Sequence, residues 1–332
     1  MFVRWIRAMV VVLIAAALSL SAAAAGGASP LRALEIATGS VGGAFHLVGA
    51  AVARELESAL RIPVTAAVTQ GSAENVRLLD RGSVELAIIA SNAIWPAWKG
   101  EHPYQERSYR NMRLVMYLYP NPTVFYALRS SGISKIRELK GRRVGVGTAP
   151  ATWDHLTGAF LAAHGLDYSK DIRKVYGSFD ALARQVGDGL LDAAIGTASG
   201  GILIPAIQEL ALQKPLNFLE WDEAAIKKLS TEYPYFFPAT VPGRNLPGYA
   251  AGRDYATVDL GGPYLVARAD LPVNVVYRIT EVIYKRLKEL SEQVSYLKGV
   301  AGDPRLLTSR LGDIPFHPGA ERFWRDVGLW GR

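Results

Sequence analysis

The sequence contains no cysteine, and this absence excludes disulfide bonds, thiol chemistry and thiolate metal sites. Nor is there a metal-binding spacing among the five histidines, which are His46, His102, His155, His164 and His317. A Gly-x-Ser-x-Gly nucleophile turn is missing, and Gly145-Val146-Gly147 lacks the third glycine of a dinucleotide fingerprint. We therefore expect no catalytic residue, no metal and no cofactor, and a protein that is not an enzyme.

A stripe of clustered positive charge is also lacking. The formal net charge is +7, but the basic residues are scattered, and the densest pairs are Arg142-Arg143 and Lys227-Lys228. Proteins that bind nucleic acids usually concentrate basic and aromatic residues on one face. We expect no nucleic-acid partner.

Only one long apolar run is present, and it lies at the N-terminus. Arg4 and Arg7 precede the apolar residues 8–20, and the small residues 21–25 follow. This order is typical of a secretory signal peptide, so we predict residues 1–25 as a signal cleaved after Ala25. An uncleaved anchor is the alternative, since the run is barely long enough to span a bilayer. The mature chain is then expected to be soluble and periplasmic.

Beyond that segment, short Val/Ile/Leu runs alternate with amphipathic helical patterns along the chain. Such alternation predicts an α/β protein with mostly parallel sheets flanked by helices. A second strand–helix series begins after Pro122, and a strand near 264–268 with a long helix 273–297 returns to the first series. We predict two lobes with a cleft between them: residues 31–122 plus 243–332 form lobe 1, and residues 123–242 form lobe 2. Residues 233–262 are rich in Pro, Gly and Tyr and are expected to be irregular.

Two turns with small residues are candidate anion sites. Thr38-Gly39-Ser40-Val41-Gly42-Gly43 and Gly71-Ser72-Ala73-Glu74-Asn75 each follow a predicted strand and open a predicted helix. Bare amides at the positive end of a helix dipole bind anions, and hydroxyl groups add donors. The expected contacts are Thr38, Gly39, Ser40, Gly42, Gly43, Ser72 and Asn75. The alternative is that these residues form ordinary capped turns, and Ser72 can do both.

Further candidates lie at strand ends or helix starts elsewhere in the chain. Ser91 and Asn92 follow a buried strand, where ligands gather in open α/β sheets. Thr152 and Trp153 open a helix in the second series, and Trp153 could form an apolar wall. Ser199 starts a hydroxyl-and-glycine turn, and Tyr119 lies beside the first crossing. For Asn92, Trp153 and Tyr119, ordinary loop or packing roles compete almost equally.

Seven motifs in a fixed order resemble one family of receptors. They occupy Thr38–Gly43, Gly71–Leu79, Leu118–Pro122, Leu139–Gly147, Pro238–Pro242, Leu265–Pro272 and His317–Arg322. Together they resemble the TAXI-type solute receptors of tripartite ATP-independent periplasmic (TRAP) transporters. The resemblance implies a two-lobe periplasmic binding protein, type II-like, that closes on a small organic acid or amino acid. It also implies a TRAP permease as partner, which is driven by an ion gradient.

The chain departs from this family at three places: Ala90-Ser91-Asn92, Asn121, and Pro150-Ala151-Thr152-Trp153. These changes predict an altered solute. Two alternatives remain open: the receptor of an ATP-dependent importer for a heterocycle or sulfonate, and a ligand-sensing subunit of a membrane kinase. Nothing in the sequence indicates an oligomer, so a monomer is expected.

Overall fold

The computed structural model describes residues 31–41, 43–147, 150–233, 235–250 and 252–331. The signal-peptide prediction for residues 1–25 lies outside the described residues. Residues 34–332 form one compact unit. Within the described residues, no helix is both long and apolar enough to cross a membrane.

The first sheet has five strands in the order β2-β1-β3-β12-β4. Its strands are β1 (Leu34–Ala37), β2 (Val64–Ala67), β3 (Leu86–Ala90), β4 (Met112–Tyr117) and β12 (Pro263–Arg268). β1 pairs in parallel with β2 and β3, whereas β12 runs antiparallel between β3 and β4. Residues of β3 are buried along its whole length, because helices cover both faces of the sheet.

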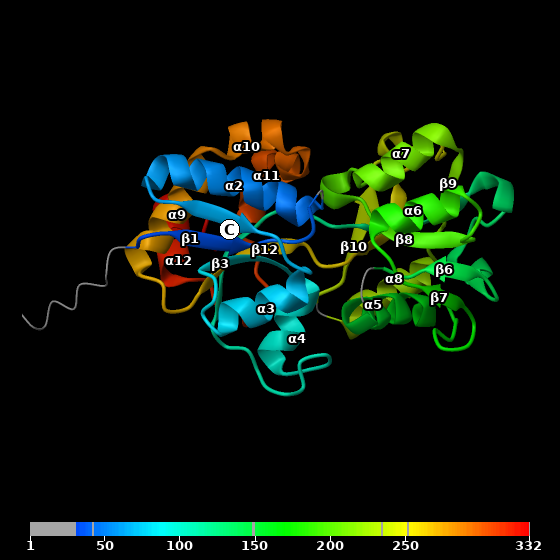
Figure 1. Ribbon diagram of the computed structural model, residues 1–332, viewed down its shortest axis with the longest axis horizontal. Coiled ribbons are helices and arrows are strands. Elements are labelled where there is room, and N and C mark those ends of the chain that lie inside the picture. Colours follow the sequence, from blue (N-terminus) through cyan, green and yellow to red (C-terminus); the bar gives the residue numbers. More distant parts are fainter. Residues whose placement is uncertain (1–30, 42, 148–149, 234, 251, 332) are drawn as a thin grey trace, which may run out of the picture. The chain divides into compact units, whose positions relative to one another are not determined.

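The helices of this region come from two parts of the chain, residues 44–99 and 273–326. They are α2 (Ala44–Leu60), α3 (Ser72–Asp80), α4 (Ser91–Lys99), α9 (Val273–Lys285), α10 (Leu287–Gln293), α11 (Lys298–Gly302) and α12 (Pro318–Asp326). Figure 1 shows α2 on one side of the strands and α3 with α4 on the other. The close fit of α2 depends on Gly49, because a Cβ there would lie 2.3 Å from the methyl carbon of Thr38.

The second sheet has the order β7-β6-β8-β5-β9 and repeats the same plan. Its strands are β5 (Thr123–Leu128), β6 (Arg143–Gly145), β7 (Arg173–Val175), β8 (Ala193–Thr197) and β9 (Leu216–Phe218). β6 pairs in parallel with β7 and β8, and β5 is inserted antiparallel between β8 and β9. Its helices are α5 (Pro150–Ala163), α6 (Phe179–Gly187), α7 (Pro205–Gln213) and α8 (Glu223–Glu232). In Figure 1, α6 and α7 lie on one side of this sheet and α5 and α8 on the other.

Residues 233–262 are not irregular throughout, which corrects the expectation for this stretch. β10 (Phe237–Val241) and β11 (Tyr255–Asp259) form an antiparallel hairpin in full register, from Phe237↔Asp259 to Val241↔Tyr255. Pro238 fits because proline is tolerated in an edge strand. The expected long helix 273–297 is also divided, since α9 ends at Lys285 and α10 begins at Leu287.

Candidate functional site

Three helices start at one edge of the first sheet. β1, β2 and β3 run in the same direction and end at Ala37, Ala67 and Ala90. Helices α2, α3 and α4 follow these ends, so their positive N-termini point toward the same edge. This edge holds most of the first-sheet residues predicted to bind a solute.

Asn75 is the centre of a buried network at this edge. Its Nδ2 donates to the backbone oxygens of Thr38 at 2.7 Å and Ile88 at 2.8 Å, and its Oδ1 accepts from Thr69 Oγ1 at 2.7 Å. The side chain is completely buried. The amide therefore fixes the ends of β1 and β3, and its polar atoms are used within the protein.

The side chain of Thr38 is also turned inward. It is buried, donates to the backbone oxygen of Ala67 at 2.7 Å and lies 3.2 Å from Nδ1 of His46. Gly39 is buried beside Phe45, while Ser40 is exposed. The backbone N–H of Gly43 donates to Ser40 at 3.0 Å, and Gly42 lies outside the described residues. Ser40 is thus the exposed polar side chain among the described residues of this turn, and the apolar Val41 beside it is exposed as well.

Ser72 joins α3 to the end of β3. It is the first residue of α3 rather than its N-cap, which is Gly71. Its Oγ accepts from the backbone N–H of Ala90 at 3.1 Å, so the capping alternative is not what the structure shows. The hydroxyl hydrogen remains available as a donor.

Ser91 is the most unusual polar group at this edge. It opens α4, is 1% exposed, and has no hydrogen-bond partner for its Oγ among the described residues. Its backbone N–H donates to Gly262 at 3.2 Å. Asn92, half-buried, follows in the first turn. A buried hydroxyl without a partner costs about 1–3 kcal/mol, and a ligand oxygen would remove that cost.

The second-sheet candidates lie in separate environments. Trp153 packs edge-on against Phe179 at 5.5 Å, and its ring covers Gly147, where a Cβ would be 2.2 Å from the indole. The side chain of Thr152 lies outside the described residues. Trp153 therefore has packing partners of its own, as the packing alternative expects.

Ser199 and Tyr119 lie at the crossing between the sheets. Ser199 opens a single 3-10 turn, and the next helix, α7, begins only at Pro205. Its buried Oγ donates to Oδ1 of Asn121 at 2.8 Å. Tyr119 is fully buried against Tyr296, with ring centroids 5.9 Å apart, and its hydroxyl has no partner among the described residues.

Sequence reasoning missed Asp259, which links the two crossing segments, residues 118–122 and 260–262. Its carboxylate accepts from the backbone N–H of Asn121 at 2.9 Å and from that of Gly261 at 2.8 Å. The side chain is 5% exposed, and burial raises its pKa to about 6 although both bonds oppose the shift. The signal in the sequence is an acidic residue between two apolar ones, Val258-Asp259-Leu260, in a run that two glycines follow.

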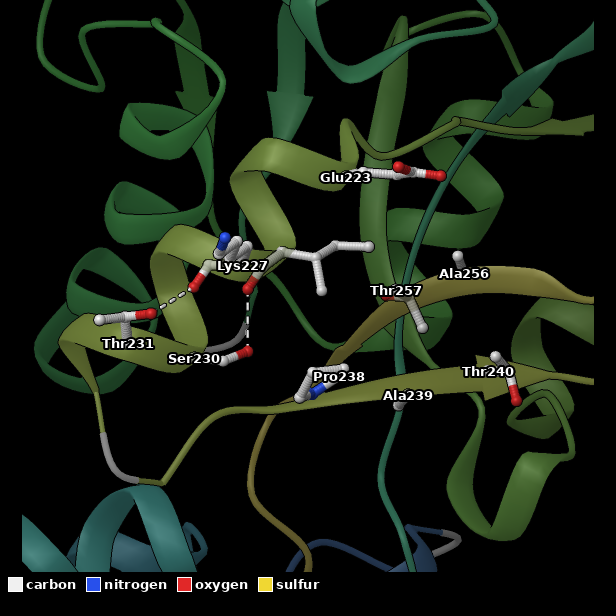
Figure 2. Close-up of a pocket in the computed structure, with 10 residues that line it drawn as sticks. Glu223, Lys227, Ser230, Thr231, Pro238, Ala239, Thr240, Ala256 and Thr257 are labelled. Carbon is white, nitrogen blue, oxygen red and sulfur yellow. Dashed lines mark hydrogen bonds between the residues drawn. The ribbon is translucent and has the colours of Figure 1, made fainter.

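A groove of about 480 Å³ lies elsewhere, between α8 and the β10–β11 hairpin. Figure 2 shows that the hydroxyls of Ser230 and Thr231 donate back into α8, to the carbonyls of Ile226 and Lys227. Thr257 donates to the carbonyl of Thr123. These hydroxyls are therefore used within the protein, whereas Lys227 and Glu223 add charged groups to the lining, and no predicted site residue lines the groove.

The charge of the candidate site comes from dipoles rather than ions. Within the part of the chain that the structure describes, no group of three or more His, Asp or Glu side chains could hold a metal ion. Ser72 and Ser91 carry neutral hydroxyl groups beside helix N-termini. Such an arrangement favours an anionic ligand without a bidentate arginine.

A model of the NMT1-like family matches residues 36–328, which is nearly the whole described chain. Among solved structures, PhnD1 from Prochlorococcus marinus in complex with methylphosphonate has a TM-score of 0.52 and 13% identity, covering 90% of this chain and 99% of that one. The alkanesulfonate-binding protein SsuA from Xanthomonas axonopodis pv. citri, bound to MOPS, has 17% identity and a TM-score of 0.49, with 90% and 85% covered. A binding protein component of an ABC phosphonate transporter from Pseudomonas aeruginosa has 12% identity and a TM-score of 0.49, with 80% and 79% covered.

These findings confirm the two-lobe α/β binding-protein fold and correct the resemblance drawn from the motifs. The predicted TAXI-type receptor is wrong, because the matching family is the NMT1-like one. The predicted TRAP permease partner is wrong for the same reason, and so is the predicted delivery of a solute to that permease. Glycine-rich turns at helix starts are a general device for binding anions, so they do not separate one receptor family from another.

Proposed function

Because the chain belongs to the NMT1-like family, we propose that it is the solute receptor of an ATP-driven ABC-type importer. Its cargo is a small organic oxyacid of the sulfonate or phosphonate class, captured outside the cytoplasm after removal of residues 1–25. The fold supports this role, and so does PhnD1, a structure of that fold that holds methylphosphonate. In this proposal, residues of the first sheet form one lobe and those of the second sheet form the other.

The observation that carries the proposal is the buried hydroxyl of Ser91. It lies at the start of α4, beside the ends of β1 and β3, and it has no partner within the described residues. A sulfonate or phosphonate oxygen would accept from this hydroxyl and from amides of the α4 first turn. Asn92, the next residue, and Ser72, whose Oγ accepts from the N–H of Ala90, are additional donors. The cation that such an anion often requires is replaced by helix dipoles.

The first test is calorimetric titration of the purified mature protein with methylphosphonate and methanesulfonate, in Tris buffer without sulfonate components. Protein is refolded beforehand to remove any solute carried through purification. Saturating binding by either compound, and none by acetate or succinate, is the expected result. Binding of the carboxylates alone would contradict the proposed solute class.

The matched variants are Ser91→Ala and Ser130→Ala, since Ser130 is an exposed serine outside the site. Loss of one charge-assisted hydrogen bond costs about 1.5–3 kcal/mol, so Ser91→Ala should weaken binding by roughly tenfold or more. Ser130→Ala should bind like the wild type. Equal solute affinities for the two variants would show that Ser91 does not contact the solute.

A further inference from the structure

We propose that Asp259 is a proton-sensitive positioning residue, whose ionisation state controls how firmly the crossing segments hold the solute site around Ser91. The inference rests on the proposed function and concerns the regulation of the same site. It starts from a chain of contacts that runs from one crossing segment to the other and then to α4.

Asp259 connects the crossing segments through backbone groups. Its two carboxylate oxygens accept separately from Asn121 and Gly261, and Leu260 N–H donates to the backbone oxygen of Asn121 at 3.1 Å. Asn121 continues the network, because its side-chain oxygen accepts from Ser199 Oγ. Protonation of the carboxyl changes one of these acceptors into a hydroxyl, but it also removes the larger free-energy cost of holding a charge in this buried place.

Gly261 carries this change directly to the solute site. Its φ is +96°, and a Cβ there would lie 2.1 Å from Ser91 Oγ and 2.9 Å from the backbone nitrogen of Asn92. Gly262 accepts the backbone N–H of Ser91. The segment that Asp259 anchors is therefore packed on the first turn of α4, so a shift of the anchor moves the wall of the site.

The surroundings of Asp259 supply no positive charge. The titratable groups that face it are Tyr117 of β4 and Tyr264 of β12, and the phenol pKa of each is raised by burial and by the negative charge of Asp259. Within the described residues no Lys, Arg or His forms an ion pair with Asp259. The ionised carboxylate thus depends on two amides for its stability, and the packed arrangement favours the proton.

The direction of the effect follows from linkage. A conformation that opens the crossing to water restores an ordinary carboxylate, whereas the packed conformation binds the proton more tightly. Acidification therefore favours the packed site, and solute affinity rises as the pH falls from 7.5 to 5. With Asp259 at a pKa of about 6 when packed and about 4 when hydrated, the gain is up to roughly tenfold.

Methanesulfonate is the probe, because a sulfonate keeps one charge over this range and its own titration cannot mimic that of the protein. Its affinity is measured at pH 7.5 and pH 5 for wild type, Asp259→Asn and the control Asp313→Asn, an exposed aspartate paired with Lys99. The wild type and the control should gain affinity at pH 5, and Asp259→Asn should bind equally at both values. A wild-type affinity that changes less than twofold, or an Asp259→Asn variant that keeps the gain, would overturn the proposal.

A second measurement uses the wild-type protein without any solute. The amide signals of Asn121 and Gly261 are followed by nuclear magnetic resonance from pH 4.5 to 8 in the full mature chain. They should move together with one midpoint near 6. Independent movement, or a midpoint near that of a free aspartate, would refute the role of Asp259. If these amides titrate as expected but no sulfonate or phosphonate binds, the proposed function fails and the proton-sensitive crossing stands.

Discussion

Asn75 shows how a side chain expected at a ligand surface can be used to build that surface instead. The sequence places it one turn into a helix after a glycine turn, which is a position typical of ligand contacts. The structure gives its amide three short hydrogen bonds and complete burial. A solute contact through Asn75 stays a prediction, and the bonds that it already makes indicate a structural role.

We expect Asn75→Ala to destabilise the protein by about 3 kcal/mol, because it leaves buried carbonyls of Thr38 and Ile88 without a donor. The measurement is the midpoint of urea unfolding. Asn274→Ala is the control, since Asn274 is exposed in α9 and its replacement should cost less than about 0.5 kcal/mol. Equal midpoints for the two variants would refute the structural role.

Strand-end reasoning identified Ser91 and Asn92 but could not find Asp259. A hydroxyl directly after a buried apolar run is visible in the sequence, because the run predicts the strand and the strand predicts the edge. The importance of Asp259 depends on Asn121, which is 138 positions away in the chain. A contact between residues so far apart in the chain forms only because the fold brings the two crossing segments together. The local sequence around either residue therefore does not predict it.

Between elements, the packing of segment 260–262 on α4 is the contact that most directly tests the arrangement of the site. Gly261→Ala adds a methyl group against Ser91 and forces an L-residue into a left-handed conformation. Backbone strain of about 1–2 kcal/mol adds to overpacking of about 1–3 kcal/mol. We expect a clear fall in the melting temperature and a weaker solute complex.

Gly252→Ala separates the two contributions to that loss. Gly252 also has a positive φ, +76°, but its Cβ would meet nothing within 4 Å. It should therefore show the backbone strain alone, and the additional loss in Gly261→Ala measures the packing against α4. If both variants melt at the same temperature, segment 260–262 does not press on the helix.

Elements with a clear period were predicted well from the sequence, and elements with mixed signals were not. Residues 86–89 are an uninterrupted apolar run and residues 45–60 have apolar residues at helical spacing, and they lie in β3 and α2. α4 is hard to predict from the sequence because Pro96 lies inside a short helix that directly follows a strand. The β10–β11 hairpin was missed since its stability comes from pairing and from packing against α8, while its sequence is rich in turn-forming residues.

For the molecule as a whole, the plan of two sheets was accessible from sequence and the transporter class was not. The order of strands and helices dictates two α/β lobes, because each parallel pair needs a crossover helix. The class of membrane partner depends on surface residues and on family membership, neither of which is determined by periodicity. The NMT1-like match supplies the family, and the ABC-type importer is the proposal made from it.

Asp259 also gives the whole molecule a characteristic dependence of stability on pH. Its pKa is raised by burial to about 6 in the fold, above the value of an unfolded aspartate, so folding takes up a proton between these two values. This contribution is fully present below the unfolded pKa and is lost as the pH rises through about 6. Carboxylates with lowered pKa values, such as Asp167 and Asp192, act in the opposite direction.

The contribution of Asp259 is isolated by subtracting the free energy of unfolding of Asp259→Asn from that of the wild type at each pH. Because the variant cannot ionise at this position, the other carboxylates cancel. The difference should fall by about 2 kcal/mol from pH 4 to pH 7, following the midpoint near 6. A difference that rises with pH would mean that the folded protein stabilises the ionised carboxylate. The packed crossing would then be a conformation that neutral pH favours, and acidification would release the solute instead of retaining it.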